Sequence, residues 1–365
     1  MKSMLRDSPT VVPYIRASVI VVTYNSITYL APCLESILSQ LSSADELIVV
    51  DNGSSDGSAD VVAEQYPHAC LFRAENTGYA GGNNFGAAQA RGEYFVILNP
   101  DTVLALGALK ALLAPLQEQT DIALTTPCIV HRDRPDIINT CGNTMQYTGL
   151  TYCRGAGRSR HEYAESAEVD AVSGAAFAIR SSVFKELGGF DETFFMYVED
   201  SDLSWRARLA GYRCFYVANA LVMHDYQPTY SQAKSFYVDR NRHLMLLKNL
   251  RRVTYMWMLP ALLLSEIVTW GFLLLQGSRY WMIKPRVYYW LWTHRAAILA
   301  THRQASALHR RNDQTVVRQM TYRLEFGQLT NQALAALASA IFDPAFWAVR
   351  WLVIRESGLH SYPEQ

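Results

Sequence analysis

The chain reads SVIVVTYNSITYLAPCLESILSQLSSADELIVV from residue 18 to residue 50. Its first six residues, Ser18 to Thr23, form a β-branched apolar run. Apolar residues then recur at helical spacing between Tyr29 and Leu41, and a second apolar run follows at 46–50. A buried strand, a crossover helix and a second buried strand are the parts of a βαβ unit with parallel strands. The stretch therefore predicts an α/β fold.

The same alternation continues along the chain, with short polar turns between the apolar segments. Because the elements alternate and their connections are short, we expect a doubly wound sheet. In such sheets ligands bind beyond the carboxyl ends of the strands. The further expected elements are a helix at 56–66, a strand at 69–72, a helix at 80–90 and a strand at 94–98.

Polar side chains follow the first two strands, at the edge of the sheet where ligands are expected. Thr23, Tyr24 and Asn25 come after the first strand, and Asp51 directly follows the second. The Asp51 carboxylate is placed to accept a hydrogen bond from the imide N–H of a pyrimidine base. The alternative interpretation is turn formation at 51–57, with a side chain of this segment capping the next helix.

A glycine-rich segment, NTGYAGGNNFG, occupies residues 76–86. Its four glycines allow close backbone approach, and the start of the helix that follows would attract a diphosphate. The segment is neither a G-x-G-x-x-G fingerprint nor a Walker loop. That difference argues against dehydrogenases, kinases and other nucleoside triphosphatases.

The strand expected at 94–98 ends in Asn99, Pro100 and Asp101. A carboxylate at the lip of the crevice is suited to hold a divalent ion that bridges a diphosphate. The alternative is that residues 101–102 cap a helix beginning near Leu106.

An acidic cluster lies within FFMYVEDSDLSWR, residues 194–206. Glu199, Asp200 and Asp202 fall within four positions, directly after an aromatic and apolar run. Carboxylates crowded together beside apolar surface raise each other's pKa, and a general base requires such a raised pKa. The alternative is a helix start, with Asp200 or Ser201 as N-cap and with Asp202 paired to Arg206.

Six ordered segments of the chain resemble family 2 glycosyltransferases of the GT-A fold, with the resemblance covering about residues 17–245. Within that family the chain is most similar to the rhamnosyltransferase branch, which transfers a sugar from a nucleotide donor to a lipid-linked or cell-surface glycan. The resemblance thus implies a GT-A doubly wound mixed sheet followed by a C-terminal helical appendage. The segments are SVIVVTYNS, ELIVVDNGSSDGS, NTGYAGGNN, ILNPD, GGFDETFFMYVEDSDLSWR and LVMHDY.

The resemblance also implies how the nucleotide donor is bound. It assigns the nucleoside and the ribose-phosphate part of the donor to two groups of residues. The first group is Thr23, Tyr24, Asn25 and Asp51, and the second is Asn76, Gly78, Gly81 and Asn84.

The metal and the catalytic base are implied in the same way. A divalent ion, Mg²⁺ or Mn²⁺, would be held by Asp101 and by His224 of the VMHDY segment. Asn99 stands where the family's D-x-D motif has its first acid, so the charge that holds the ion is reduced. Asp200 would remove the proton of the acceptor hydroxyl for an inverting displacement, while Glu199 orients the acceptor or raises the pKa of Asp200.

The function implied is inverting, metal-dependent transfer of a sugar such as L-rhamnose from a dTDP or UDP donor to a glycan or lipid-linked acceptor. The sequence has no Q-x-x-R-W segment, which favours transfer of one or a few sugars over polymerisation. Two alternatives remain open. A sugar nucleotidyltransferase would need a basic glycine-rich loop after the first strand, and a non-catalytic scaffold would bind nucleotide sugars without turnover.

Composition and charge divide the 365 residues into two regions. Residues 1–239 carry 17 Lys and Arg against 27 Asp and Glu, whereas residues 240–365 carry 16 against 6. We expect an N-terminal arm at 1–16, a catalytic domain at 17–245 and a basic, apolar helical region at 246–365. The basic region indicates an anionic membrane surface rather than nucleic acid, for which the sequence has no motif.

The compartment follows from the cysteines and the N-terminus. The six cysteines show no C-x-x-C pair, and residues 1–16 lack the apolar core of a signal peptide. We therefore expect reduced thiols and a catalytic part that faces the cytoplasm.

Residues 253–275 contain one charge, Glu266, and are long enough to cross a bilayer. Three interpretations compete: a spanning helix, an in-plane anchor, and a buried helix or one that forms a homo-oligomer. Basic residues flank the segment on both sides, which favours peripheral or monotopic attachment at the inner face of the membrane. In the preceding helix, expected at 235–249, we place Arg240 and Arg242 near enough to the crevice to meet a diphosphate.

Overall fold

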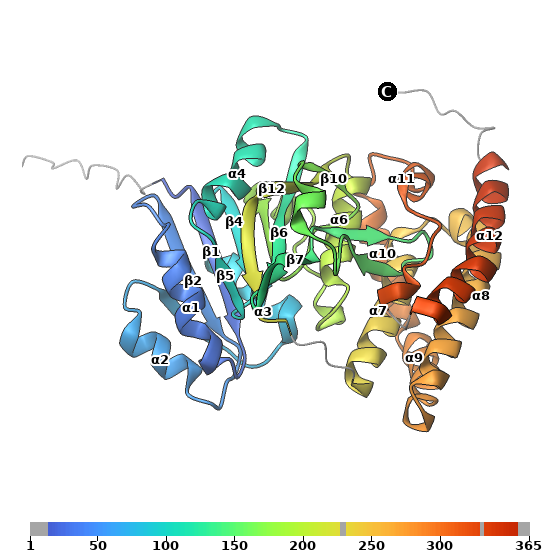
Figure 1. The fold of residues 1–365 in the computed structure, drawn as a ribbon, viewed down its shortest axis with the longest axis horizontal. Helices are drawn as coiled ribbons and strands as arrows, with labels where there is room; N and C mark the ends of the chain where they lie inside the picture. Colours follow the sequence, from blue (N-terminus) through green and yellow to red (C-terminus); the bar gives the residue numbers. More distant parts are fainter. Residues whose placement is uncertain (1–13, 227–230, 329–331, 357–365) are drawn as a thin grey trace, which may run out of the picture.

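The computed structural model describes residues 14–226, 231–328 and 332–356. Figure 1 shows a twisted sheet flanked by helices, with the C-terminal helices gathered at one end of the molecule. The expected α/β fold is confirmed. The N-terminal arm expected at 1–16 lies almost entirely outside the described residues, which begin at Tyr14.

The first half of the chain forms the parallel part of the sheet, in the order β4-β1-β2-β3. The predicted elements are confirmed to within a few residues. In register, Thr23 of β1 lies opposite Asp51 of β2, so both strands end at the same level. The elements are β1 (Ala17–Thr23), α1 (Ile27–Leu38), β2 (Asp45–Asp51), α2 (Ser58–Gln65), β3 (Cys70–Arg73), α3 (Gly78–Gln89) and β4 (Tyr94–Leu98).

The second half of the sheet is mixed. β11 (Ala176–Arg180) runs antiparallel to β4 and to β6 (Ile122–His131), while β12 (Arg213–His224) runs parallel to β6. Because β11 is antiparallel to β4, its first residues lie at the ligand-binding end of β4. The shorter strands on this side are β5 (Thr102–Leu104), β7 (Arg134–Thr140) and β10 (Ala167–Val169), and β8 (Asn143–Met145) pairs with β9 (Thr151–Cys153) in a separate hairpin.

Alternate side chains of the strands build two apolar layers. Val19 and Val21 face α1, α2 and α4 (Ala108–Glu118), whereas Ile20 and Phe177 face α3, α5 (Ser181–Glu186) and α6 (Glu199–Leu209). This alternation is the period-two pattern of a strand covered on both faces. The sheet is therefore the central layer of three.

Two glycines set the distance between α3 and the sheet. A Cβ on Gly82 would lie 2.7 Å from Val22 Cγ1, and a Cβ on Gly86 would lie 2.7 Å from Ile20 Cγ2. Both glycines are thus required for helix packing. The expectation that the glycines of this segment serve a diphosphate applies to neither of them.

The C-terminal helices pack on the sheet domain through a shared apolar core. Trp205 of α6 belongs to the same buried cluster as Leu244, Met258 and Phe346. The boundary expected between residues 245 and 246 falls inside α7. The helices are α7 (Gln232–Asn249), α8 (Arg252–Leu275), α9 (Ile283–Thr293), α10 (Arg295–Ser306), α11 (Asp313–Gln319) and α12 (Gln332–Glu356), and the 3₁₀ turns are η1 (Arg160–Tyr163), η2 (Glu192–Phe194), η3 (Ser278–Tyr280) and η4 (Phe326–Gln328).

By length and composition, α8 is the one helix among the described residues that could cross a membrane. Of its most apolar window, 28% is buried inside the protein. The helix also carries exposed apolar side chains, and it lies at the end of the molecule opposite α2 (Figure 1).

Candidate active site

The ends of β1 and β2 carry two buried polar atoms that lack partners. Thr23 and Asp51 lie opposite each other in the register of the two strands, and both side chains are buried. Within the described residues, Thr23 Oγ1 and Asp51 Oδ1 make no hydrogen bond. Leaving such an atom unsatisfied costs about 1–3 kcal/mol. A ligand with a hydrogen-bonding edge would remove this cost.

Tyr24 and Asn25 form the rim beside these two residues. Tyr24 is half exposed, and Asn25 adopts a left-handed backbone with φ 48°. Asn25 Oδ1 accepts from the backbone N–H of Ser55 at 2.8 Å, and its own N–H donates to Ser54 Oγ at 3.0 Å. Asn25 therefore ties the first loop to the second, while Tyr24 is left free to contact a ligand.

The loop that enters α3 is held by its own side chains. Asn76 Oδ1 accepts from the N–H of Gly78 at 2.9 Å. A Cβ on Gly78 would lie 2.3 Å from the carbonyl oxygen of Phe195, and one on Gly81 would lie 2.5 Å from Thr77 Oγ1. Both glycines are thus needed because other parts of the same chain pack closely against them.

The side chain of Asn84 is bound to the loop before η2. Its Nδ2 donates to the carbonyl of Phe190 at 2.9 Å and to Glu192 at 3.0 Å, and its Oδ1 accepts from the N–H of Phe190 at 2.9 Å. Since the amide is fully used, we assign Asn84 to holding the loop before η2. We therefore do not assign Asn84 to donor binding.

The structure brings Asp101 and His224 together. Asp101 Oδ1 lies 3.3 Å from His224 Nε2 and, within the described residues, accepts no hydrogen bond. Asn139 Oδ1 lies 3.0 Å from His224 Nδ1 and so fixes the orientation of the ring. Two ligand atoms this close, with the second ring nitrogen held by a neighbour, fit two positions around one divalent ion.

A second group of possible metal ligands does not fit an ion. Asp239, His243 and Glu266 place one ligand atom each within 4.8 Å of one another. However, Lys284 Nζ donates to Asp239 at 2.8 Å and to Glu266 at 2.7 Å, and Arg242 pairs with both carboxylates. Two cations therefore already neutralise the two acids, and the group connects α7, α8 and α9.

The backbone before α6 is strained. Phe195, Tyr197 and Val198 have φ values of 62°, 69° and 71°, although none of them is glycine. Each such residue costs about 1–3 kcal/mol unless its surroundings enforce it. Helix α6 begins directly afterwards, at Glu199, and no side chain caps it. The interpretation of Asp200 or Ser201 as the N-cap is therefore wrong.

Residues of α7 hold this strained segment in place. The side-chain amide of Asn241, which is fully buried, donates to the carbonyls of Phe194, Met196 and Tyr197 at 3.0, 2.9 and 2.7 Å. Arg240 donates to the carbonyls of Thr193 and Phe194 at 2.7 and 2.8 Å. We expected Arg240 to contact a diphosphate. Its guanidinium group instead binds the backbone of the loop before α6.

Arg242, for which the same expectation was stated, is also engaged inside the protein. It is buried, donates to the carbonyl of Thr148 at 3.3 Å and to Ser265 Oγ at 3.1 Å, and pairs with Glu266. These contacts connect α7 to α8. The guanidinium group of Arg242 is therefore bound inside the protein and does not face a diphosphate.

Asp200 is held from two sides. Its Oδ2 accepts from the N–H of Gly174 at 2.8 Å and from Asn143 Nδ2 at 3.3 Å, while its Oδ1 accepts from the N–H of Ser201 at 2.6 Å. Burial raises its pKa, although the hydrogen bonds oppose this shift. Burial and the neighbouring Asp200 raise the pKa of Glu199 well above its usual range. Both carboxyl groups therefore lose their protons less readily than exposed acids, and Glu199 is the one whose pKa is raised well above its usual range.

Backbone contacts connect Asp200 to the loop at residues 99–101. The N–H of Asn99 donates to the carbonyl of Ala175 at 2.9 Å, one residue beyond the Gly174 N–H that binds Asp200. The two residues that precede β11, Gly174 and Ala175, therefore contact Asp200 and Asn99, and they link residues 99–101 to Asp200.

Asp202 has the structural role expected of it. Its carboxylate accepts from Arg206 Nε at 2.8 Å, Lys248 Nζ at 2.9 Å and Asn249 Nδ2 at 2.8 Å. Burial alone would raise its pKa, but the charges of Lys248 and Arg206 lower that pKa to about 2. This acid connects α6 to the end of α7.

Comparisons with known proteins decide what kind of site this is. The sequence profile of the family described as Glycosyl transferase family 2 matches residues 18–188. Over 235 residues, 56% of this chain and 75% of the relative, the sequence is 32% identical to N-acetylglucosaminyl-diphospho-decaprenol L-rhamnosyltransferase of Mycobacterium tuberculosis. The chain belongs to family 2 of the glycosyltransferases.

Other family 2 relatives and solved structures agree. The chain is 32% identical over 183 residues, half of its length, to pre-mycofactocin glycosyltransferase of Mycobacterium tuberculosis, and covers 37% of that protein. It resembles GalNAc-T7 solved with UDP, GalNAc and Mn²⁺ (TM-score 0.55, 17% identity, 75% of this chain, 55% of that one). It also resembles residues 1–349 of S. aureus TarS in complex with UDP-GlcNAc (TM-score 0.52, 18% identity, 96% and 94%). These structural similarities confirm the GT-A fold.

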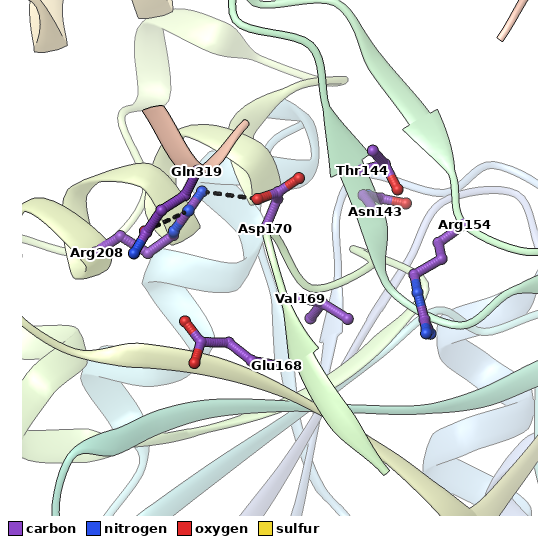
Figure 2. Close-up of a pocket in the computed structure, with 8 residues that line it drawn as sticks. All are labelled: Asn143, Thr144, Arg154, Glu168, Val169, Asp170, Arg208 and Gln319. Carbon is purple, nitrogen blue, oxygen red and sulfur yellow. Dashed lines mark hydrogen bonds and ion pairs between the residues drawn. The ribbon is translucent and has the colours of Figure 1, made fainter. Parts of the chain in front are cut away.

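This family 2 glycosyltransferase has a polar cavity of about 400 Å³ (Figure 2). Asn143, whose side chain donates to Asp200 at 3.3 Å, lines it, so this one side chain links the cavity to the candidate base. At the edge of the cavity, the guanidinium group of Arg208 lies 3.1 Å from the carboxylate of Asp170. Figure 2 shows the side chains arranged around the cavity from the β8–β9 hairpin, β10, α6 and α11. They are Asn143, Thr144, Arg154, Glu168, Val169, Asp170, Arg208 and Gln319.

Sequence reasoning missed the residues that hold Asp200 and the turn before it. Asn143 lies on a short strand that no periodicity indicated, so nothing in the sequence pointed to it. The role of Asn241, in contrast, could have been inferred from the sequence. Residues 239–243, DRNRH, form a polar run inside a helix, and four of the five are buried. Buried polar residues in such a run must have protein partners, so the run could have been interpreted as an internal network.

Proposed function

We propose that this glycosyltransferase transfers one or a few sugars, L-rhamnose in the first place, from a dTDP or UDP donor to a lipid-linked or cell-surface glycan, with inversion. The observation that carries the proposal is a set of buried atoms without partners: Thr23 Oγ1, Asp51 Oδ1, Asp101 Oδ1 and Glu199 Oε2. Such atoms also occur elsewhere in the chain, but these four lie on residues that the sequence assigned to donor, metal and acceptor. L-Rhamnose is supported by the name of the 32% identical relative.

The donor base binds at the ends of β1 and β2. The imide N–H of uracil or thymine donates to Asp51 Oδ1, and Thr23 Oγ1 provides a second polar contact. Tyr24, exposed at the rim, stacks on the base. Because both pyrimidines present the same imide edge, this part of the site accepts either dTDP or UDP.

Asp101 and His224 hold the Mg²⁺ or Mn²⁺. The ion supplies positive charge against the donor diphosphate when it is bound. Asn139 keeps the His224 ring oriented, and Asn99 contributes no charge. The site therefore has one carboxylate, and we expect the affinity for the metal alone to be low until the diphosphate adds its own oxygens.

Asp200 removes the proton of the acceptor hydroxyl. The hydroxyl oxygen then attacks the anomeric carbon from the face opposite the leaving diphosphate, and the configuration inverts. Burial and the neighbouring Asp200 favour the protonated form of Glu199, and in that form it donates a hydrogen bond to the acceptor. A single displacement needs one base and no protein nucleophile, and Asp200 is the base in this proposal.

The polar cavity beside Asn143 receives the acceptor glycan. Its lining mixes hydrogen-bond donors, such as Arg154, with acceptors, such as Glu168 and Asp170. Sugar hydroxyls both donate and accept, so they need such a mixture. The volume of about 400 Å³ lies in the range of small-ligand sites, about 300–1,000 Å³.

The test is a screen of dTDP-L-rhamnose, UDP-GlcNAc and GDP-mannose, each with Mg²⁺ or Mn²⁺. N-acetylglucosaminyl-diphospho-polyprenol serves as acceptor, and product formation and donor hydrolysis are measured. We expect turnover of a pyrimidine donor that EDTA abolishes, and an anomeric configuration opposite to that of the donor. Retention of configuration would overturn the single displacement, and a purine donor would overturn the role of Asp51.

Variants separate transfer from binding. Asp200→Asn should abolish transfer while donor-induced thermal stabilisation stays unchanged, and Asp51→Asn should lose that stabilisation. If the wild type binds a donor but turns over none of the donors with this acceptor, the protein is a nucleotide-sugar scaffold instead.

A further inference from the structure

Helix α8 presents a charge-free apolar stripe to the outside. Its exposed side chains recur at helical spacing, so they fall on one face. Glu266, the one charged residue from 253 to 275, turns inward to Arg242 and Lys284. At 1.5 Å per residue, the stripe is about 33 Å long. It includes Val253, Trp257, Leu263, Ile267 and Leu274.

Helix α12 presents a similar stripe, and it packs beside α8 at the end of the molecule (Figure 1). From 332 to 352 its only charged residues, Asp343 and Arg350, bind the backbone N–H of Leu324 and the carbonyl of Arg318. No charge is therefore left on the outer face of this part of the helix. The exposed stripe consists of Leu337, Ile341, Trp347, Trp351 and Leu352.

The surroundings of the two stripes are basic. Arg252 and Arg279 stand exposed at the two ends of α8, and Arg286 is exposed on α9. Of the acids after residue 239 whose side chains the structure describes, Glu266, Asp313 and Asp343 are bound to protein groups, and Glu325 is exposed. An apolar face with a cationic rim is complementary to an anionic lipid surface.

We propose that α8 and α12 lie in the plane of an anionic bilayer, with their apolar stripes among the acyl chains and their arginines at the headgroups. The inner face of α8 excludes a spanning arrangement. It carries the Glu266, Arg242 and Lys284 network and packs against α7, which holds the loop before Asp200. Crossing the bilayer would bring these charges into hydrocarbon. A second copy of the chain fits less well, because its equally basic rim would repel the first.

The experiment is flotation of the full chain with vesicles of phosphatidylcholine, with and without phosphatidylglycerol. The proposal predicts co-flotation with the anionic vesicles. Binding should weaken but persist at high salt, because the arginine contacts are screened and the apolar contacts are not. A wild-type chain that stays at the bottom of the gradient with both vesicle types would overturn the proposal.

Paired substitutions locate the surface. Trp257→Glu with Ile267→Glu on α8, and Leu337→Glu with Trp351→Glu on α12, should each reduce vesicle binding about tenfold or more. Leu106→Glu is the matched control, because Leu106 is 90% exposed beside α4, away from the C-terminal helices (Figure 1). Equal loss of binding in the control, or no loss in either pair, contradicts the assignment.

Two measurements keep the test independent of folding. Trp257→Phe preserves the apolar surface, so it should float like the wild type while fluorescence quenching by brominated lipid decreases. Sedimentation of the wild type without lipid gives the other outcome. If the chain is a stable oligomer that the glutamate pairs convert to monomers, while vesicle binding is absent, a second copy covers the stripes and the lipid proposal fails.

Discussion

The side-chain amide of Asn241 donates to the main-chain carbonyl of Tyr197 at 2.7 Å, across 44 residues of chain. The same amide reaches the carbonyls of Phe194 and Met196, so one buried side chain binds most of the turn that precedes Glu199 and Asp200. Three residues of this turn have left-handed backbone without being glycine. The position of the proposed base thus depends on a residue of α7, a helix that sequence reasoning placed beside the donor.

Replacing Asn241 should lower kcat more than it changes the KM for the donor. Without the amide, the strained turn relaxes and Asp200 moves, and a misplacement of about 1 Å can cost about 10²-fold in rate. Donor-induced thermal stabilisation should persist in Asn241→Ala, because the ends of β1 and β2 are untouched. A loss of donor binding in step with kcat would instead show general unfolding.

The pH dependence of transfer should reflect the carboxylate pair. Burial raises the pKa of Asp200 and raises that of Glu199 well above its usual range, so the ionised base is available only at a higher pH than for an exposed aspartate. Activity should therefore fall on the acid side above the ordinary aspartate pKa of about 4. A profile of kcat against pH checks this, and a flat profile down to that pH contradicts it.

Asp202 should matter for stability rather than for chemistry. Asp202→Asn leaves Arg206 buried without its carboxylate and leaves Lys248 paired with Asp191 alone, and breaking such a buried pair costs about 3–5 kcal/mol of unfolding free energy. Its pKa of about 2 lies below the unfolded value, so the stabilisation is present above pH 4 and is lost as the pH falls toward 2. Urea unfolding at several pH values measures both effects.

Asp133→Asn is the control for Asp202→Asn. Asp133 is 76% exposed and pairs with Arg134 at 3.4 Å. Its replacement should change the unfolding free energy by less than about 0.5 kcal/mol, because an exposed pair contributes little. Equal losses in the two variants would argue against the buried network as the cause.

The metal site should depend on Asn139 as well as on its two ligands. Asp101→Asn or His224→Ala should abolish the effect of Mn²⁺ on donor binding. Asn139→Ala should weaken it about 10–100-fold, because the ring of His224 loses the group that orients it. Calorimetric titration of the donor with and without Mn²⁺ measures this, and the exposed His161 replaced by Ala is the control. Unchanged Mn²⁺ dependence in His224→Ala would remove this assignment.

Blocking the polar cavity should affect the acceptor alone. Thr144→Trp fills part of the space beside Asn143, so the KM for the acceptor should rise about tenfold or more while the KM for the donor stays constant. Initial rates at varied acceptor and fixed donor check this expectation. An unchanged acceptor KM would place the acceptor elsewhere.

Much of the fold followed from sequence alone because its signals are local. The β-branched apolar run in Ser18–Thr23, the helical spacing after Tyr29 and the polar residues at the strand ends are all signals that span only a few residues. Parallel strands end at one edge, so Thr23 and Asp51 had to be neighbours once the strands were assigned. Asp202 with Arg206 is likewise an i,i+4 pair that a helix dictates.

Only the tertiary structure decided which polar residues are free to act. Asn84 and Arg240 have the same chemistry as ligand-binding residues, but packing directs their side chains to backbone carbonyls far away in the chain. Glycines of the 76–86 segment serve helix packing, because what a Cβ would meet depends on residues that sequence spacing does not specify. Tertiary packing likewise decides which face of α8 is exposed. Its sequence is apolar all round, and only the positions of Arg242 and Lys284 decide that Glu266 turns inward and the opposite side remains exposed.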